Sequence, residues 1–148
     1  MKRNSRKKAR ANVIRVRTWT HAQAQAARPY VSSVVRSVRE HFLEAIRGHN
    51  QVEELTKRAG RPNRDSIIAL AEAQREFDAA RGRFEDAETE LNDLDVYVLD
   101  PVQGLALIPF VHDERLAWFV FDLFDTEPLR FWRYQEDTLE TRRPIEVG

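Results

Sequence analysis

Hydrophobic residues in the first two thirds of the chain recur every seven positions, a rhythm that predicts two long α-helices. In each helix the apolar positions form two rows three residues apart, so both rows lie on one face and make a packing seam. Gly60 and Pro62 interrupt the pattern and separate the helices. We therefore expect residues 20–95 to form a long antiparallel helical hairpin of coiled-coil type. The seams include Ala24, Val31, Val38, Ala45 and Val52 in the first helix, and Leu70, Ala73, Phe77, Ala80, Phe84, Ala87 and Leu91 in the second.

The first helix carries local signals for its start, its bend and its partner. Thr20 and Gln23 have the spacing of a capping box, which marks a helix N-terminus. Pro29 removes one backbone hydrogen bond and predicts a kink in the first turns. Closing the hairpin brings Gly48 opposite Phe77, so the missing side chain makes room for the ring. At about 1.5 Å per residue this helix is roughly 55–60 Å long, so part of the hairpin should project beyond a small sheet.

The period of the pattern changes after the hairpin, where β-branched and aromatic residues predict strands. Short polar connections between these strands imply a four-stranded antiparallel meander over residues 96–134. Residues 12–19 alternate in the manner of a short edge strand that could join the sheet, and residues 135–148 form a C-terminal tail. The sequence thus predicts a single α+β domain over residues 12–148. The expected strands are 96–99, 104–111, 115–124 and 129–134.

The segment from Arg115 to Phe124 is apolar on both of its faces. An antiparallel sheet with one wet face alternates apolar and polar residues, so this sheet should be covered on both sides. The hairpin can cover one face, and the C-terminal tail, another chain or a ligand can cover the other. We expect a homo-oligomer, with a dimer favoured, because a large apolar surface usually marks an interface. The candidate interface residues are Trp118, Phe119, Phe121, Phe124 and Trp132.

Charge is unevenly distributed along a chain that is neutral overall, with 24 Lys and Arg against 24 Asp and Glu. Eleven basic residues precede the first acidic one, Glu40. Residues 1–11 hold nothing to bury and are expected to form a disordered basic arm. Such an arm is either a solubilising tail or a contact for nucleic acid or another polyanion, because its cations can replace phosphate counterions. The candidate contacts are Lys2, Arg3, Arg6, Lys7, Lys8 and Arg10.

Few residues suggest catalysis or cofactor binding, and we expect no cofactor and name no catalytic residue. The chain has no Cys, so it has no disulfide and no thiolate ligand. His41 and Glu44 are the candidate metal ligands, although a di-metal helical site would need a second histidine-bearing helix. His112 begins a polar turn that is normally just solvated. No apolar run reaches the ~18 residues of a membrane span, so we expect a cytoplasmic protein without membrane contact.

Several short motifs resemble a prokaryotic family known as domain of unknown function 2203. Trp19-Thr20 and the early Pro29 stand where that family has F-T and a proline. The stretch from Gly104 to Pro109 aligns with G-L-V-D-F-P, and the segment from Val120, VFDLFDTEPLRFWRYQ, aligns with a stretch ending I-R-F-W-H-E. The chain closes with the family's R-x-P, as Arg142-Arg143-Pro144. The resemblance spans most of residues 18–145 and implies a fold without a known activity.

Several departures from the family affect its polar or aromatic positions. The family's Asp is Leu107, its second Trp is Asp122, its Gly-Glu is Asp125-Thr126, and its His is Arg133. A polar site built from that Asp, Glu and His would be lost here. We therefore expect a non-enzymatic oligomerisation or protein-interaction module. The alternatives are an accessory nucleic-acid-binding protein that uses the basic arm, and a small metal-binding protein or enzyme.

Overall fold

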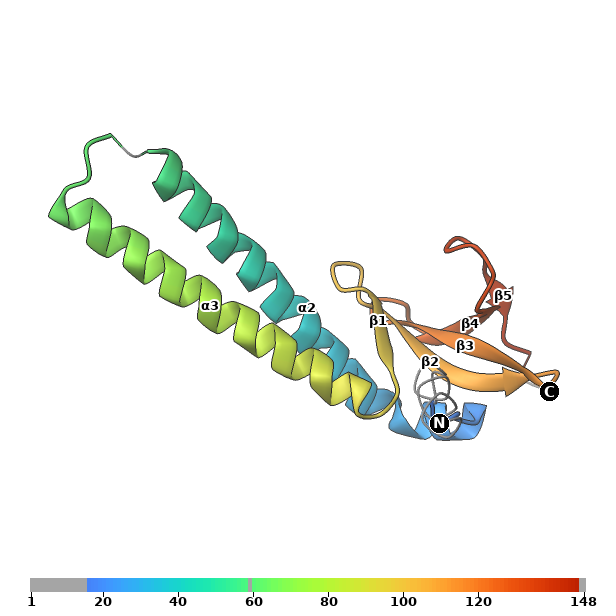
Figure 1. The fold of residues 1–148 in the computed structure, drawn as a ribbon. Helices are drawn as coiled ribbons and strands as arrows, with labels where there is room; N and C mark the ends of the chain where they lie inside the picture. The colour runs from blue at the N-terminus through green and yellow to red at the C-terminus, as the bar shows by residue number, and fades with distance from the viewer. Residues whose placement is uncertain (1–15, 59, 147–148) are drawn as a thin grey trace, which may run out of the picture.

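The computed structural model describes residues 16–58 and 60–146, which form an α+β fold of a helical hairpin and one antiparallel sheet (Figure 1). The hairpin consists of α2 (His21–Lys57) and α3 (Arg64–Asn92). The sheet has five strands in the order β1-β2-β3-β4-β5, so every strand pairs with its neighbour in sequence. The predicted hairpin and meander are thereby confirmed. The strands are β1 (Tyr97–Asp100), β2 (Leu105–His112), β3 (Arg115–Asp122), β4 (Leu129–Tyr134) and β5 (Arg143–Pro144).

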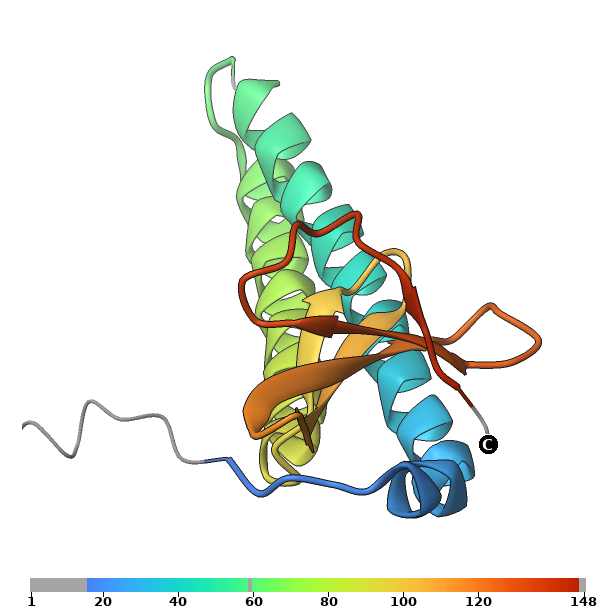
Figure 2. The ribbon, with the colours of Figure 1, turned by 90° about the vertical axis from the view of Figure 1, so that its right-hand side faces the viewer.

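The predicted signals fix the start and the course of α2. Thr20 Oγ1 accepts a hydrogen bond from the Gln23 amide, and the Gln23 side chain accepts one from the Thr20 amide, which completes the capping box. The helix continues through Pro29, which lacks the amide that would bond to the carbonyl of Gln25. The first turns, drawn in blue, are bent away from the rest of the helix (Figures 1 and 2). The bend lets them follow the sheet while the remainder follows α3.

A glycine sets the closest approach between the two helices. A Cβ atom at Gly48 would lie 3.0 Å from the Cα and 3.2 Å from the Cβ of Phe77. The imidazole of His49 packs against the Phe77 ring, with 5.5 Å between ring centroids. Further along, Arg83 donates to the Glu44 carboxylate across the hairpin at 3.2 Å. The predicted pairing of Gly48 with Phe77 is confirmed, and it fixes the register of α2 against α3.

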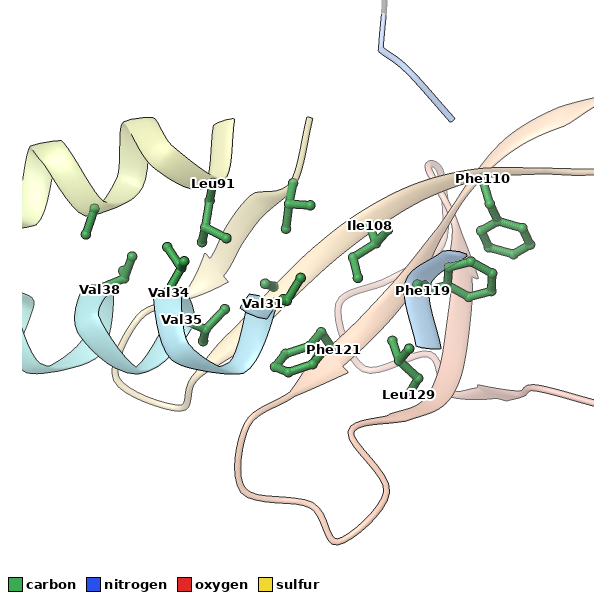
Figure 3. Packing of buried hydrophobic residues seen from close by; sticks show 14 of the residues in the cluster. Val31, Val34, Val35, Val38, Leu91, Ile108, Phe110, Phe119, Phe121 and Leu129 are labelled. Atoms are coloured by element: carbon green, nitrogen blue, oxygen red, sulfur yellow. The ribbon is translucent and has the colours of Figure 1, made fainter. Parts of the chain in front are cut away.

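One face of the sheet packs against the first half of α2 to form the core. Val31, Val34, Val35 and Val38 of the helix meet buried residues of the strands (Figure 3). Phe121, which is fully buried, lies directly opposite this helical surface. The other strand residues of this core include Ala106, Ile108, Phe110, Ala117, Phe119 and Leu129.

The opposite face of the sheet is covered in part by the chain's own C-terminal tail. Trp118 is buried there; its indole N–H donates to Gln135, and the Tyr97 ring meets it edge-on at 5.9 Å. The tail then supplies β5, which pairs with β4 at Phe131 and Trp132. The sequence left three possible covers for this face: the C-terminal tail, another chain or a ligand. In the structure, the tail covers part of it.

The fifth strand therefore comes from the C-terminus, and the predicted N-terminal edge strand is wrong for the described residues. Residues 16–19 form no strand, and residues 12–15 lie outside the described residues. From residues 16–19, the described part of this segment, one backbone hydrogen bond reaches the sheet, from the Trp19 amide to the Pro109 carbonyl at 2.8 Å. The Arg17 amide donates instead to the Asp95 carboxylate at 3.0 Å. An acidic side chain thus takes the donor that a strand ladder would have used.

Replacing Gly48 by alanine should destabilise the protein, even though alanine favours a helix by about 1 kcal/mol. The new methyl group meets the backbone of Phe77, which cannot rotate away, and overpacking costs about 1–3 kcal/mol. We expect Gly48→Ala to lower the free energy of unfolding by up to about 2 kcal/mol in urea titrations. Gly82→Ala is the control, because a Cβ there meets no atom within 4 Å, and it should raise stability by up to about 1 kcal/mol. A gain in stability for both variants would contradict the close approach.

Candidate functional site

The projecting part of the hairpin, residues 39–82, extends beyond the sheet (Figure 1). Many of its apolar side chains are half exposed. In the described part of α2, no residue after Val38 is buried. The seam there is made of half-buried side chains, and only small residues of α3, Ala73 and Ala80, are buried against them. Ile67 and Ile68 are 58% and 45% exposed near the tip, and Ile46 is 39% exposed. Two helices alone do not remove this seam from water.

The projecting part is also the electrically neutral part of an acidic body. Residues 39–82 contain eight Lys and Arg and eight Asp and Glu. Residues 83–148 contain six basic and sixteen acidic residues. Like charge therefore opposes association of two copies through the sheet much more than through the projecting part.

A second exposed apolar patch, the notch, lies where the hairpin leaves the sheet and consists of Arg39, Val102 and Phe124. Arg39 Nε donates to the Val102 carbonyl at 2.9 Å, and its guanidinium lies 4.9 Å from the centre of the Phe124 ring. The Phe124 side chain is 59% exposed. Gly104, at φ +68°, supports this loop, because a Cβ there would lie 2.9 Å from that of Leu123. Ile46 follows Arg39 two turns later on the same face of α2.

The five interface residues expected from the sequence occupy different environments. Phe119 and Phe121 are buried in the core under α2, and Trp118 is buried beneath the C-terminal tail. Trp132 is half-buried at the far end of the sheet. Phe124 alone among them is exposed, in the notch. The two-sided apolar pattern thus reflects burial within one chain at three of the five positions.

A cleft of about 940 Å³ opens at the N-terminus of α2, between the ends of the central strands and β5. Phe110 and Phe119 stack there, with ring centroids 3.9 Å apart and an interplanar angle of 5° (Figure 3). The edge of Trp132 approaches Phe110 at 5.6 Å, and His112 lies 4.3 Å from Trp132. The cleft is lined by residues 18–21, 110–112, 119, 132 and 142–146.

An ion pair holds β5 and the wall of the cleft in place. Arg143 donates to both oxygens of Asp137, at 2.8 and 3.0 Å, and the Tyr134 amide donates to the same carboxylate at 2.8 Å. The Arg143 hydrogen bonds, followed by that of the Tyr134 amide, lower the pKa of Asp137 from 3.8 to about 2. The guanidinium of Arg143 also lies over Trp132, at 5.4 Å from the ring centre. Asp137 thereby joins β4, β5 and the aromatic wall.

The proposed metal ligands form only a pair. His41 Nδ1 lies 3.5 Å from Glu44 Oε2, and the same carboxylate accepts a hydrogen bond from Arg83 at 3.2 Å. The hydrogen bonds from Arg83 and then His41 lower the pKa of Glu44. Within residues 16–58 and 60–146, no cluster of three or more His, Cys, Asp or Glu could hold a metal ion. The third side chain at this carboxylate is thus a cation, Arg83.

The remaining candidates lie at the turn of a hairpin or outside the described residues. His112 Nε2 lies 3.5 Å from Asp113, in a turn where Asp113 and Glu114 have φ values of +49° and +63°. The predicted contacts Lys2, Arg3, Arg6, Lys7, Lys8 and Arg10 lie outside the described residues. The sequence analysis missed the cleft, including His21, Arg142 and Arg143. Its one signal was the R-x-P motif, whose place beside β4 depends on a pairing that the local pattern does not indicate.

The chain belongs to the family described as uncharacterized conserved protein DUF2203, whose model matches residues 17–145. No curated protein and no solved structure matches the chain. None of the helices in the described ranges is long and apolar enough to cross a membrane.

Several residues of the family motifs line the cleft, and three of the departing positions lie on the tail-covered face of the sheet. Thr20, Trp132, Arg142 and Pro144, which match the family motifs, line the cleft, as does Trp19, which stands where the family has Phe. Three departing positions lie on the face that the tail covers, because they share it with Trp118 and Val120 in the strand register. These positions are Leu107, Asp122 and Arg133.

Asp137 should stabilise the fold most at neutral pH and lose this effect in acid. Its folded pKa of about 2 lies below its ordinary value of 3.8, so its contribution is present above pH 4 and disappears as pH falls toward 2. We expect Asp137→Asn to lower the urea midpoint at pH 7 and to leave it close to the parent's at pH 2. Glu76→Gln on the exposed surface of α3 is the control and should change neither midpoint. An equal loss at both pH values would show that the charge of Asp137 is not what matters.

Proposed function

We propose that this protein is a non-enzymatic interaction module that self-associates through the projecting part of its hairpin. The observation that supports the proposal is the seam beyond Val38, which two helices leave half exposed. A second copy is the occupant that we favour, because the neutral projecting part presents no like-charge barrier to itself. We place the module in the cytoplasm, in keeping with a chain that has no cysteine.

The geometry favours a two-fold antiparallel arrangement of hairpins. The stretch of α2 from Arg39 to Lys57 is about 27 Å long at about 1.5 Å per residue. Two such stretches that cross antiparallel bring the tip of one hairpin, with Ile67 and Ile68, beside the notch of the other. In a two-fold interface each contact occurs twice, so both tips and both notches are covered at once. Phe124, the one exposed member of the predicted interface, lies within this surface.

The apolar residues of this surface suggest modest affinity. Full burial of an isoleucine is worth about 1.5–3 kcal/mol, and Ile46, Ile67 and Ile68 are already about half buried, so each has about 1 kcal/mol left to gain. Two copies together gain about 6 kcal/mol from these residues, at the low end of the ~4–15 kcal/mol entropic cost of association. Added burial of the seam, including Phe42 and Phe77, would be needed for net binding. A dimer of micromolar affinity requires about 8 kcal/mol of net binding free energy, so the seam would have to supply most of it.

Charged substitutions in the projecting part should dissociate the dimer without unfolding the chain. We expect the parent protein to sediment as a dimer at about 100 μM, and Ile46→Asp and the double variant Ile67→Asp/Ile68→Asp to sediment as monomers. Burying an unpaired carboxylate costs more than the interface supplies. Circular dichroism should be unchanged, since these residues are exposed in the single chain.

Leu139→Asp is the matched control, because Leu139 is an even more exposed apolar residue, at 65%, but lies in the C-terminal tail. It should leave the dimer intact. A parent protein that stays monomeric at 100 μM would refute the proposal. Dissociation by Leu139→Asp alone would move the interface from the hairpin to the sheet.

A further inference from the structure

The described part of the C-terminal tail, residues 135–146, crosses the sheet as a strap that contributes no buried residue of its own. The strap begins where β4 ends and returns along β4 as β5 (Figure 2). Of its apolar side chains, Leu139 is 65% exposed and Ile145 is half-buried. Segments with few buried apolar contacts belong to the least stable part of a protein and can open while the rest stays folded.

The strap does not pack against the sheet along its whole length. A hollow of about 430 Å³ lies between the middle of the strap and the turn that joins β1 to β2. Leu99 and Leu105 line this hollow from the sheet, and Leu139 and Glu140 line it from the strap. Direct packing of these apolar side chains would stabilise the closed strap. The hollow therefore removes a contact that would otherwise hold the strap in place.

Polar contacts hold the strap instead. The Asp137 carboxylate accepts hydrogen bonds from Arg143 and from the Tyr134 amide. Glu136 pairs with Arg115, but both side chains of this pair are more than half exposed. Because exposed ion pairs contribute little to stability, the contacts of Asp137 are the main tie between the strap and the sheet.

A cation beneath the strap works against closure. Arg133 is 7% exposed, and it donates to the carbonyls of Asp137 and Tyr134, at 2.6 and 3.4 Å. Its Nη1 is buried and has no hydrogen-bond partner among residues 16–58 and 60–146. Burial of a charged group with an unpaired donor costs free energy. Opening of the strap would return this guanidinium to water, so its burial favours the open state.

We propose that residues 135–146 form a releasable strap, which opens as one unit while the hairpin and strands β1–β4 stay folded. Opening uncovers Arg133 together with Trp118, whose indole N–H donates to Gln135 of the closed strap. Trp118 is one of the interface residues expected from the sequence. The strap thus controls whether this part of the sheet is accessible, and this device does not depend on the proposed self-association through the hairpin.

Hydrogen exchange of the full-length protein, followed by NMR, tests the proposal at two amides. The Tyr134 amide donates to Asp137, and the Ile145 amide, near the other end of the strap, donates to the Arg130 carbonyl at 2.9 Å. Both should be at least about 100-fold less protected than the ladder amides of β3, the central strand. Their protection should be equal, because one opening exposes both. It should stay constant in up to about 1 M urea, whereas that of β3 should fall, since the strap exposes far less surface than unfolding does.

Two substitutions should move the strap in opposite directions. Asp137→Asn should lower the protection of both amides about 5- to 20-fold, because it removes the charge-assisted hydrogen bonds that close the strap. Arg133→Met should raise the protection of both about 3- to 10-fold, since an apolar side chain of similar length replaces the buried cation. Arg130→Met is the matched control, because Arg130 is exposed on the same strand and pairs with Asp125 outside the strap. It should leave both amides unchanged.

Four results would overturn the proposal. Protection equal to that of β3 would mean that the strap opens only when the whole protein unfolds, and no protection at either amide would mean that it does not close. Unequal protection of the two amides would show fraying rather than one opening. A loss of protection in Arg133→Met would show that the guanidinium holds the strap closed. If Arg133→Met does not fold by circular dichroism, the urea series on the parent protein decides alone.

Discussion

The architecture depends on a mismatch in length between α2 and the sheet that it packs against. The helix has 37 residues, and the sheet buries only its first half, up to Val38. The second half relies on α3 alone, and the close contact at Gly48 and Phe77 holds the two helices in register. Everything proximal to Val38 is therefore a conventional two-layer core. Everything distal to it is a two-helix extension whose apolar seam remains partly exposed to solvent.

The sheet has two apolar faces, and the helical hairpin covers only one of them. The chain covers the second face with Tyr97 and its own tail, and Asp137 ties that tail down by accepting hydrogen bonds from Arg143 and the Tyr134 amide. Arg133 takes part from beneath the tail, where it is 7% exposed and donates to the Asp137 carbonyl at 2.6 Å. Its Nη1 has no hydrogen-bond partner within the described part of the chain. This cation stands where the resemblance places a histidine, so the covered face differs in charge from the one that the family motif implies.

The sequence predicted those features that arise from contacts near in sequence or from a regular period. The capping box at Thr20, the hairpin seam, the pairing of Gly48 with Phe77 and the four-strand meander all follow from spacing alone. The source of the fifth strand could not be predicted from spacing. β5 has only two residues, and its position depends on the contact with Asp137 rather than on a sequence pattern. The cleft was missed for the same reason. Its walls come from residues more than a hundred positions apart, and a one-dimensional pattern does not indicate which of them meet.

The predicted interface residues show that the type of a residue does not reveal whether the fold exposes it. Phe119 and Phe121 suggest an exposed apolar sheet only while the sheet is considered without its helix, and α2 buries both. The exposed apolar residues lie where a layer ends, at the hairpin tip and in the notch beside Phe124. The aromatic residues of the cleft likewise lie beyond the point where α2 begins. The projecting part and the cleft are thus both consequences of where α2 starts and stops relative to the sheet. Since they lie at opposite ends of one helix, a chain that associates through the first would leave the second open.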